Sequence, residues 1–324
     1  MTVVIFSEPT DVHAQAVIRE LAKLGESDVH LIDFRNIPQR TAVNMALSNA
    51  HGSGFELVPF GGKPLRMDAV RAFWWRRPQA FAIPPGMAPH AQHFALTEIS
   101  TAMQGMWQCS EGLWVNNIVR DSAAAHKPWQ LEMARRAGLA IPDTLITTDP
   151  DKVRAFWDSR EGEVIYKPFL QTLHSWRETR QLKREELALL DSVRIAPVIF
   201  QGLVPGAADL RVTVIGDEVL PAAVDIRKME YKLDVRLNQQ EYERHELPAE
   251  VTARLLALMR ALGLEYGAID LRLTPDGDYV FFEVNPAGQF LFVEHACGLP
   301  ISQVLASHLA RGTAAAGEAL AEAA

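Results

Sequence analysis

Residues 267–289, with the sequence GAIDLRLTPDGDYVFFEVNPAGQ, constrain the fold of this chain more than any other stretch. Two runs that favour β-structure flank a Pro-Asp-Gly turn at 275–277, and this pattern predicts a β-hairpin. Glu283 and Asn285 lie two residues apart, so both side chains are expected on one face of the second strand. A two-residue Asp-Gly turn would put Asp270 directly opposite Glu283. A three-residue loop that includes the proline would shift this register by one residue.

The polar residues of this hairpin predict a site for a hard cation. Asp270, Glu283 and Asn285 supply two carboxylates and an amide oxygen, and neither strand carries a His or Cys. Such ligands suit Mg²⁺ that is shared between the protein and nucleotide phosphates. The alternative is a solvent-facing hairpin whose polar side chains merely alternate outward. We favour the metal site because Tyr279 and Phe281 are expected on the face of Glu283, and unpaired carboxylates on a half-buried face are costly.

Length and composition describe an ordinary globular protein. The 324 residues are enough for two or three structural units, and 48% hydrophobic and 22% charged residues are typical values. A net charge of −8 and a pI near 5.7 argue against nucleic acid as a partner. The two cysteines, Cys109 and Cys297, indicate neither a disulfide framework nor a thiolate metal site. No signal peptide or membrane-length apolar run is visible, so a cytoplasmic setting without a membrane partner is expected.

The first part of the chain predicts a small parallel sheet. Strands at 2–6 and 28–34 enclose an amphipathic helix at 11–24, and this βαβ order is typical of parallel strands. The turn at 7–10, Ser-Glu-Pro-Thr, lacks the glycines that would cradle a pyrophosphate, so no nucleotide is expected here. The other elements expected in this part are a strand at 70–78, a helix at 88–111 and a short strand at 113–116.

A second unit is expected to begin near Asn117. The helices predicted in it are 127–138, 150–158, 176–190 and 249–262, and the predicted strands are 139–147, 163–167, 197–206, 209–215 and 218–226. Helix 249–262 has the clearest signal, because its apolar residues form one stripe and Gly263 follows as a cap. The expected division is therefore 1–116, then 117–312 with subdomains 117–196 and 197–312. The Ala-rich tail 313–324 has no assigned role.

The order of two lysines, a strand-loop segment and a carboxylate hairpin resembles the ATP-grasp superfamily. More narrowly, the chain up to the tail resembles the microviridin-type ribosomal peptide maturases, also called graspetide synthetases. The stretches that carry this resemblance are FWWRRP (73–78), HKPWQLEMARRAGLAIPDTLIT (126–147), VIYKP (164–168), LDVR (233–236), HELP (245–248) and FFEVNPAGQFLFVEHACGLPIS (281–302). The resemblance implies an α/β (α+β) ATP-grasp fold with an N-terminal βαβ pre-ATP-grasp domain, and it implies ATP and Mg²⁺ as cofactors.

The resemblance also implies which residues bind the nucleotide. The residues expected to bind ATP are Lys127, Lys167, Gln201, Leu203, Val204 and Asp209. The two lysines would neutralise the triphosphate, although a lone lysine at a strand end is more often a solvated surface residue. Segment 201–204 would contact the adenine. Because Gly202 stands where the superfamily often has an acidic residue, Asp209 is the expected alternative anchor for the ribose.

Two further pairs of residues are expected to act on the substrate. Arg211 resembles the catalytic arginine of the family, whose planar guanidinium binds the transferring phosphoryl oxygens, and Arg227 is a weaker candidate. Both could instead be surface arginines of a strand. Asp234 and Arg236 resemble the motif through which peptide maturases engage their precursor. The alternative for this pair is a solvated, charged loop.

The implied activity is that of an ATP-dependent ligase acting on a ribosomal precursor peptide with a leader and a core. It would phosphorylate an Asp or Glu side chain, and a Ser or Thr hydroxyl or a Lys amine would then close an ω-ester or ω-amide macrocycle. One alternative is an ATP-grasp ligase that joins free amino acids or adds residues to a peptide terminus. Another is a non-catalytic module that binds nucleotide or peptide, against which the intact lysines and metal ligands count. The resemblance further suggests a homodimer.

Overall fold

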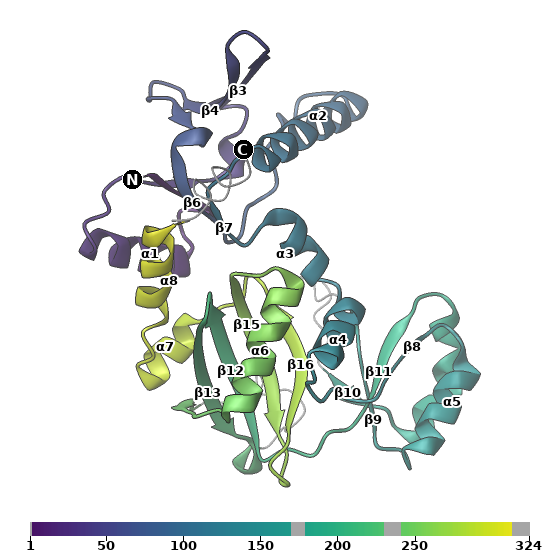
Figure 1. The fold of residues 1–324 in the computed structure, drawn as a ribbon. Helices are drawn as coiled ribbons and strands as arrows, with labels where there is room; N and C mark the ends of the chain where they lie inside the picture. Colours follow the sequence, from purple (N-terminus) through teal and green to yellow (C-terminus); the bar gives the residue numbers. More distant parts are fainter. Residues whose placement is uncertain (1, 170–178, 230–240, 313–324) are drawn as a thin grey trace.

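A computed structural model describes residues 2–169, 179–229 and 241–312 (Figure 1). Within these ranges the strands form four sheets, with the orders β2-β1-β6-β7, β3-β4-β5, β10-β9-β11-β8 and β14-β13-β12-β15-β16. Figure 1 shows the first two sheets at one end of the molecule and the last two side by side at the other. No helix in the described ranges is long and apolar enough to cross a membrane.

The N-terminal sheet is parallel throughout, as the βαβ order predicts. Its strands are β1 (Thr2–Phe6), β2 (Val29–Ile32), β6 (Val70–Trp75) and β7 (Leu113–Val115), and its helices are α1 (Val12–Lys23) and α2 (Pro89–Gln108). The sequence analysis missed the antiparallel sheet of β3 (Thr41–Ser48), β4 (Gly52–Pro59) and β5 (Leu65–Arg66). Half of the residues of β3 are exposed, and no buried face requires apolar residues at every second position. The sequence of β3 therefore lacks the regular alternation that would predict a strand.

The small antiparallel sheet lies beside α4 in Figure 1. It consists of β8 (Thr144–Thr147), β9 (Val164–Lys167), β10 (Arg180–Gln181) and β11 (Val198–Gly202), and α5 (Pro150–Ser159) packs on it. The charged α-helix predicted at 176–190 is wrong for the residues described. They form β10 and a 3₁₀ segment, Arg184–Arg194. Leu187, Leu190 and Val193 face the core at intervals of three residues, a spacing that suits three residues per turn better than 3.6.

The large antiparallel sheet carries the predicted hairpin. Its strands are β12 (Ala208–Ile215), β13 (Glu218–Asp225), β14 (Glu243–Arg244), β15 (Tyr266–Leu273) and β16 (Tyr279–Asn285), and its helices are α3 (Ile118–Ala124), α4 (Lys127–Arg136) and α6 (Ala249–Leu262). Figure 1 shows α6 lying across one face of the sheet. The prediction of α6 is confirmed at both ends, and its apolar stripe is buried against β12, β15 and β16. Short 3₁₀ turns occur at Phe34–Asn36, Met67–Ala69 and Ile226–Lys228.

The hairpin pairs Asp270 with Glu283 as expected, but through a longer loop and a β-bulge instead of a two-residue turn. Its loop spans three residues, because the N–H of Thr274 bonds to the carbonyl of Asp278 (2.9 Å) and Gly277 takes a φ of +93° that favours glycine. That loop alone would misalign the strands. A β-bulge corrects the register, since Leu271 pairs with Phe281 whereas Asp270 pairs with Glu283. The predicted opposition of the two carboxylates is therefore confirmed.

The bulge also reverses one expectation about the strand faces. Phe281 is fully buried in the core beneath α6, and Tyr279 packs against the same core. Neither residue shares the face of Glu283, so that prediction is wrong. Phe282, the extra residue of the bulge, lies instead on the carboxylate side, where the Arg272 guanidinium sits 5.2 Å from its ring centre. A strict two-residue alternation cannot foresee this change of face.

The C-terminal helices return the chain to the N-terminal sheet. They are α7 (Leu291–Cys297) and α8 (Ile301–Arg311), and the sequence analysis assigned neither. Figure 1 shows α8 beside α1. Buried residues of α8, among them Leu305 and Leu309, share one core with Val3, Ile5 and Val17. Residues near the two ends of the described chain therefore pack in one core. The proposed domain boundary after residue 116 remains a prediction.

Candidate functional site

A cluster of charged side chains occupies the face of the large sheet opposite α6. Arg211 pairs with Asp270 across β12 and β15, and its Nη1 donates to Oδ1 of Asp270 at 2.8 Å. Lys127, the first residue of α4, forms an ion pair with Oε2 of Glu283. Lys167, at the end of β9, interacts electrostatically with Glu283, Lys127 and Asp270. The cluster therefore joins three cations and two carboxylates from the two neighbouring sheets and the start of α4.

Gln130 explains why Lys127 meets Glu283. Its side-chain amide is buried, donates to the carbonyl of Val284 (2.8 Å) and accepts from the N–H of Val284 (3.0 Å). Because β16 is the edge strand of its sheet, this amide replaces the missing neighbour strand. The bond ties α4 to β16 one residue away from Glu283. Sequence analysis did not single out Gln130, which lies within one turn of Lys127.

The electrostatics of the cluster favour an anionic ligand. Burial lowers the pKa of Lys167 to about 8, with Lys127 adding to this shift and Glu283 and Asp270 opposing it. Burial alone would raise the pKa of Glu283, but Lys127 and Lys167 outweigh it and the pKa is lowered. Burial raises the pKa of Asp270, an effect that Glu283 strengthens and Arg211 opposes. With three cations against two carboxylates, the site is suited to bind phosphate groups.

The carboxylates also fit a hard metal ion. Glu283 and Asp270 keep 34% and 35% of their side chains exposed. One oxygen of each is bound by a cation, and the other accepts no hydrogen bond from the described residues. Asn285 lies on the same face, since it pairs with Ala268 two residues from Asp270, and it is exposed. These oxygens are the donors that Mg²⁺ prefers, with positions left for phosphate and water.

A pocket next to the cluster collects most of the residues expected to contact adenine. It measures about 60 Å³ between the small and large sheets, and its lining includes Lys167, Gln201, Leu203, Val204 and Phe282. The N–H of Leu203 donates to the carbonyl of Glu163 (2.8 Å), so the small sheet braces this segment. Phe282 was not anticipated as a lining residue, because it enters the pocket through the bulge.

Arg272 links this pocket to Asp209. Its guanidinium binds both carboxylate oxygens of Asp209, at 2.7 and 2.9 Å, and also donates to the carbonyl of Val204 at 3.1 Å. Asp209 therefore orients Arg272 in this structure, and its role as a ribose anchor stays a prediction. Sequence analysis missed Arg272. The available signal was its position two residues after Asp270, on the same face of β15.

Solved structures show what this chain is similar to. No protein-family model and no curated protein matches the chain. The chain superimposes on the macrocyclase MdnC from Microcystis aeruginosa MRC, bound with the precursor peptide MdnA, with a TM-score of 0.84. The two sequences are 28% identical, and the alignment covers 96% of this chain and 100% of MdnC. The full-length match at 28% identity supports the assignment of this chain to the graspetide synthetases of the ATP-grasp superfamily.

Two further solved structures are similar to this chain over nearly its whole length. The ATP-grasp ligase PsnB, complexed with a minimal precursor, Mg and ADP, is 27% identical with a TM-score of 0.76, and the alignment covers 95% of this chain and 96% of PsnB. A ribosomal-peptide-associated ATP-grasp ligase from Chryseobacterium gregarium, in complex with ADP and a leader and core peptide, has a TM-score of 0.85. At 22% identity, with coverage of 96% and 97%, this last match supports the fold alone. The family and fold class expected from the motifs are confirmed.

The remaining residues that the motifs assigned to the site lie apart from the charged cluster or beyond the described ranges. Arg227 is exposed and pairs with Asp225 beyond the end of β13, at 2.8 and 2.9 Å. No hydrogen bond or ion pair within the described ranges joins Arg227 to the charged cluster. Asp234 and Arg236 lie outside the described residues. All three assignments remain predictions.

Proposed function

We propose that this graspetide synthetase uses ATP and Mg²⁺ to close ω-ester or ω-amide macrocycles in a ribosomal precursor peptide. The observation that carries this proposal is the full-length match to a macrocyclase bound to its precursor peptide. The charged cluster and the neighbouring pocket support the proposal, because together they offer a site for phosphate groups next to a mostly apolar site for adenine. PsnB complexes with a precursor, Mg and ADP support the same choice of ligands.

The reaction consists of two substitutions. A carboxylate oxygen of a peptide Asp or Glu attacks the γ-phosphorus of ATP, the bond from that phosphorus to the β–γ bridging oxygen breaks, and ADP leaves. A Ser or Thr hydroxyl or a Lys amine of the same peptide then attacks the acyl carbon. The bond to the phosphate oxygen breaks, and the displaced phosphate carries away the proton of the nucleophile. Each ring therefore costs one ATP and removes one water from the peptide.

The chain contributes positioning and charge to these steps. Lys127 holds the phosphates from the start of α4 and Lys167 from the end of β9, and Arg211 is aimed at the transferring group by its bond to Asp270. Asp270, Glu283 and Asn285 would hold Mg²⁺, which supplies charge neutralisation between phosphate oxygens. The pocket beneath 201–204 would exclude water from one side of the adenine ring. These roles need no titrating base on the protein for the first step, because the attacking carboxylate is already ionised at neutral pH.

Lys127 and Lys167 should both contribute to nucleotide affinity, and Lys167 should also take up a proton when the nucleotide binds. Lys127→Ala and Lys167→Ala should each weaken a non-hydrolysable ATP analogue by roughly tenfold to a hundredfold. The free-protein pKa of Lys167 is about 8, and a bound triphosphate favours the ammonium and raises it. Between these two pKa values, binding must take up a proton, so uptake should grow as the pH rises past the lower value.

Titration calorimetry in buffers of different ionisation enthalpy measures this uptake. Lys167→Arg is the matched variant, because its guanidinium stays charged and should bind without proton uptake. Unchanged affinity in both alanine variants, or equal uptake in wild type and Lys167→Arg, would contradict the placement of the triphosphate.

Co-expression with a candidate precursor peptide, taken from a short Thr/Ser- and Asp/Glu-rich reading frame near the gene, tests the activity itself. We expect intact-mass analysis to show the peptide losing one water for each ring, and the Glu283→Gln variant to leave its mass unchanged. Ligation of free amino acids without any peptide dehydration would favour the alternative ligase. Nucleotide binding without turnover of ATP would favour the non-catalytic module.

We also infer that Asp234 and Arg236 engage the precursor, and that the enzyme acts in the cytoplasm as a homodimer. Cys109 and Cys297 are both free thiols, which suits a reducing compartment. Light scattering coupled to gel filtration measures the oligomeric state directly, and a monomer mass would exclude the dimer.

A further inference from the structure

The segment 286–289, named here the anchor loop, follows Asn285 and leads into α7. Every carbonyl of this loop accepts a hydrogen bond from a side chain elsewhere in the chain. The donors are Asn116 Nδ2 to Pro286 (3.0 Å), Arg76 Nη1 to Ala287 and to Gly288 (3.1 Å), Tyr266 Oη to Gly288 (2.9 Å), and Arg211 Nη2 to Gln289 (3.1 Å). The position of the loop is therefore determined by residues that lie far from it in the sequence.

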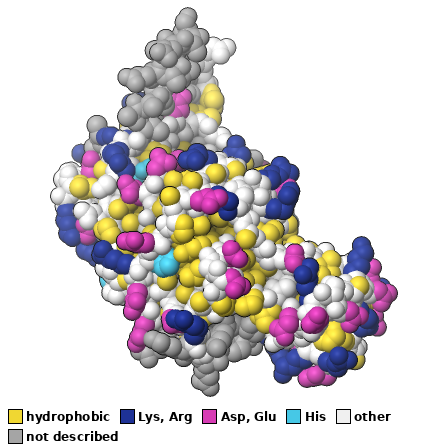
Figure 2. All heavy atoms as spheres, turned by 60° about the horizontal axis from the view of Figure 1, so that its bottom comes forward, with side chains coloured by type: hydrophobic (Ala, Val, Ile, Leu, Met, Phe, Trp, Pro, Cys, Tyr) yellow, Lys and Arg dark blue, Asp and Glu magenta, His cyan; other side chains and the backbone are white. Residues whose placement is uncertain are grey.

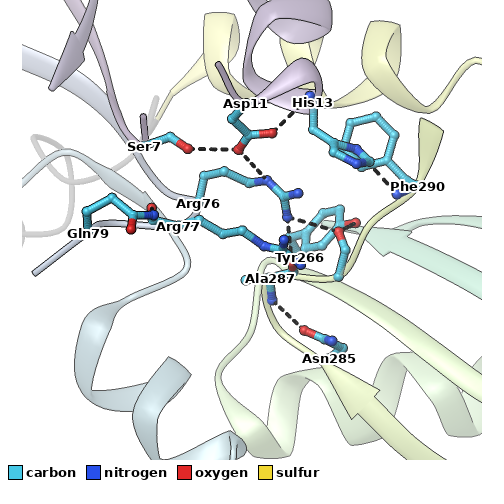
Figure 3. A network of polar contacts seen from close by, with 11 residues as sticks. Ser7, Asp11, His13, Arg76, Arg77, Gln79, Tyr266, Asn285, Ala287 and Phe290 are labelled. Atoms are coloured by element: carbon cyan, nitrogen blue, oxygen red, sulfur yellow. Dashed lines mark hydrogen bonds and ion pairs between the residues drawn. The ribbon is translucent and has the colours of Figure 1, made fainter. Parts of the chain in front are cut away.

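Arg76 is the donor that comes from the N-terminal sheet. Figure 3 shows its guanidinium between Asp11 and the anchor loop. Its Nε donates to Oδ2 of Asp11 (3.1 Å), while Asp11 also accepts from Ser7 Oγ (2.7 Å) and from the N–H of His13 (3.0 Å). Arg76 is 1% exposed, so its guanidinium is fully buried where it joins the N-terminal sheet to the loop that follows β16.

Stability alone does not explain a guanidinium at this place. Burial lowers the pKa of Arg76, and the attraction of Asp11 opposes that shift. Nη2 of Arg76 is buried without a hydrogen-bond partner in the described part of the chain. An apolar side chain of similar volume commonly joins two layers at least as stably as a buried ion pair. What the guanidinium supplies, and an apolar residue cannot, is a directed bond to the carbonyls of the anchor loop.

The anchor loop lies directly against the catalytic groups. A Cβ on Gly288 would stand 2.3 Å from Cβ of Ala268 and 2.9 Å from Nη2 of Arg211, so the loop backbone packs closely against both residues and only glycine fits here. The carbonyl of Gln289 holds Arg211, and the N–H of Ala287 bonds to Oδ1 of Asn285 at 3.1 Å. A displacement of the loop would therefore move both side chains.

We propose that Arg76 is a positioning residue for phosphoryl transfer, which acts through the anchor loop on Arg211 and Asn285 and touches no substrate. The inference rests on the function proposed above for those two residues. It assigns a task in the reaction to the N-terminal sheet, which contributes no residue to the charged cluster or the pocket.

Hydrogen exchange tests the mechanical part of this inference without any substrate. In Arg76→Met the amides of 287–290 should exchange at least about tenfold faster than in wild type, because the loop loses its anchor. Arg35→Met is the matched control, since Arg35 forms an ion pair with Asp33 in the same N-terminal part and does not touch the loop. Arg76→Lys keeps the charge beside Asp11 and should fold even if the methionine variant does not. Unchanged protection of these amides in a folded Arg76 variant overturns the proposal.

Kinetics with Mg-ATP and the precursor peptide test the coupling. Arg76→Met should lower kcat by roughly tenfold to a hundredfold, as expected for a displacement near 1 Å, with little change in KM for ATP. Arg76→Lys should give an intermediate rate. In an Arg211→Lys background the same substitution should have a much smaller further effect, because only the part that acts through Asn285 remains. Fully additive losses in the double variant overturn the proposal. A wild-type enzyme that releases no ADP refutes the proposed function instead. In that case the hydrogen-exchange result alone decides whether Arg76 holds the loop.

Discussion

Glu283→Gln is expected to lower turnover of ATP by about 10²-fold or more while the protein remains folded. The substitution keeps the shape of the side chain but removes a charge that pairs with Lys127 and belongs to the proposed metal site. It leaves three cations facing Asp270 alone and removes one of the oxygen ligands that would hold Mg²⁺, so the charge neutralisation that the ion would supply is weakened. Asn285→Ala should act in the same direction, because it removes the amide oxygen from the same face of β16.

Steady-state release of ADP measures this loss, and circular dichroism checks the fold. Asp276→Asn is the matched control, because this carboxylate lies in the exposed loop of the same hairpin and should leave the rate unchanged. Wild-type rates in both Glu283→Gln and Asn285→Ala would exclude this hairpin as the metal site.

Arg211→Lys is expected to lower kcat by about 10²-fold, with a much smaller change in KM for ATP. The guanidinium reaches Asp270 and the carbonyl of Gln289 at the same time, and both contacts hold it rigidly on the sheet. A lysine keeps the charge but cannot make two divergent bonds in one plane. The loss should therefore appear in the chemical step, where the orientation of the charge matters most, and less in ground-state binding.

The same measurement decides between the two arginines proposed from the sequence. Arg227→Lys should retain nearly full activity, because Arg227 is exposed and pairs only with Asp225 among the described residues. Arg260→Lys, on the exposed side of α6, serves as the control for a general loss of arginine. A large loss in Arg227→Lys together with a small one in Arg211→Lys would reverse the assignment.

Patterns within single elements were readable from the sequence because their information is local. The apolar stripe of 249–262 predicts α6 at both ends, and the alternation around the Pro-Asp-Gly turn predicts the hairpin. The same hairpin also shows where such reasoning ends. The three-residue loop and the bulge at Phe282 each shift the register by one residue, and their effects cancel at Asp270 and Glu283 but not at Phe281.

The sequence by itself indicated the family through the resemblance of its motifs. It also determined the hairpin with its carboxylates and the helix that covers it, since residue spacing within an element fixes which side chains share a face. Only the tertiary structure decided which elements meet. Arg76 and Gly288 are separated by 212 residues, and Lys127 and Glu283 by 156, yet each pair is in contact. The packing of α8 beside α1 has the same origin. Contacts of this kind depend on how the sheets stack and on which chain ends share a core, and no periodicity within one segment records that choice.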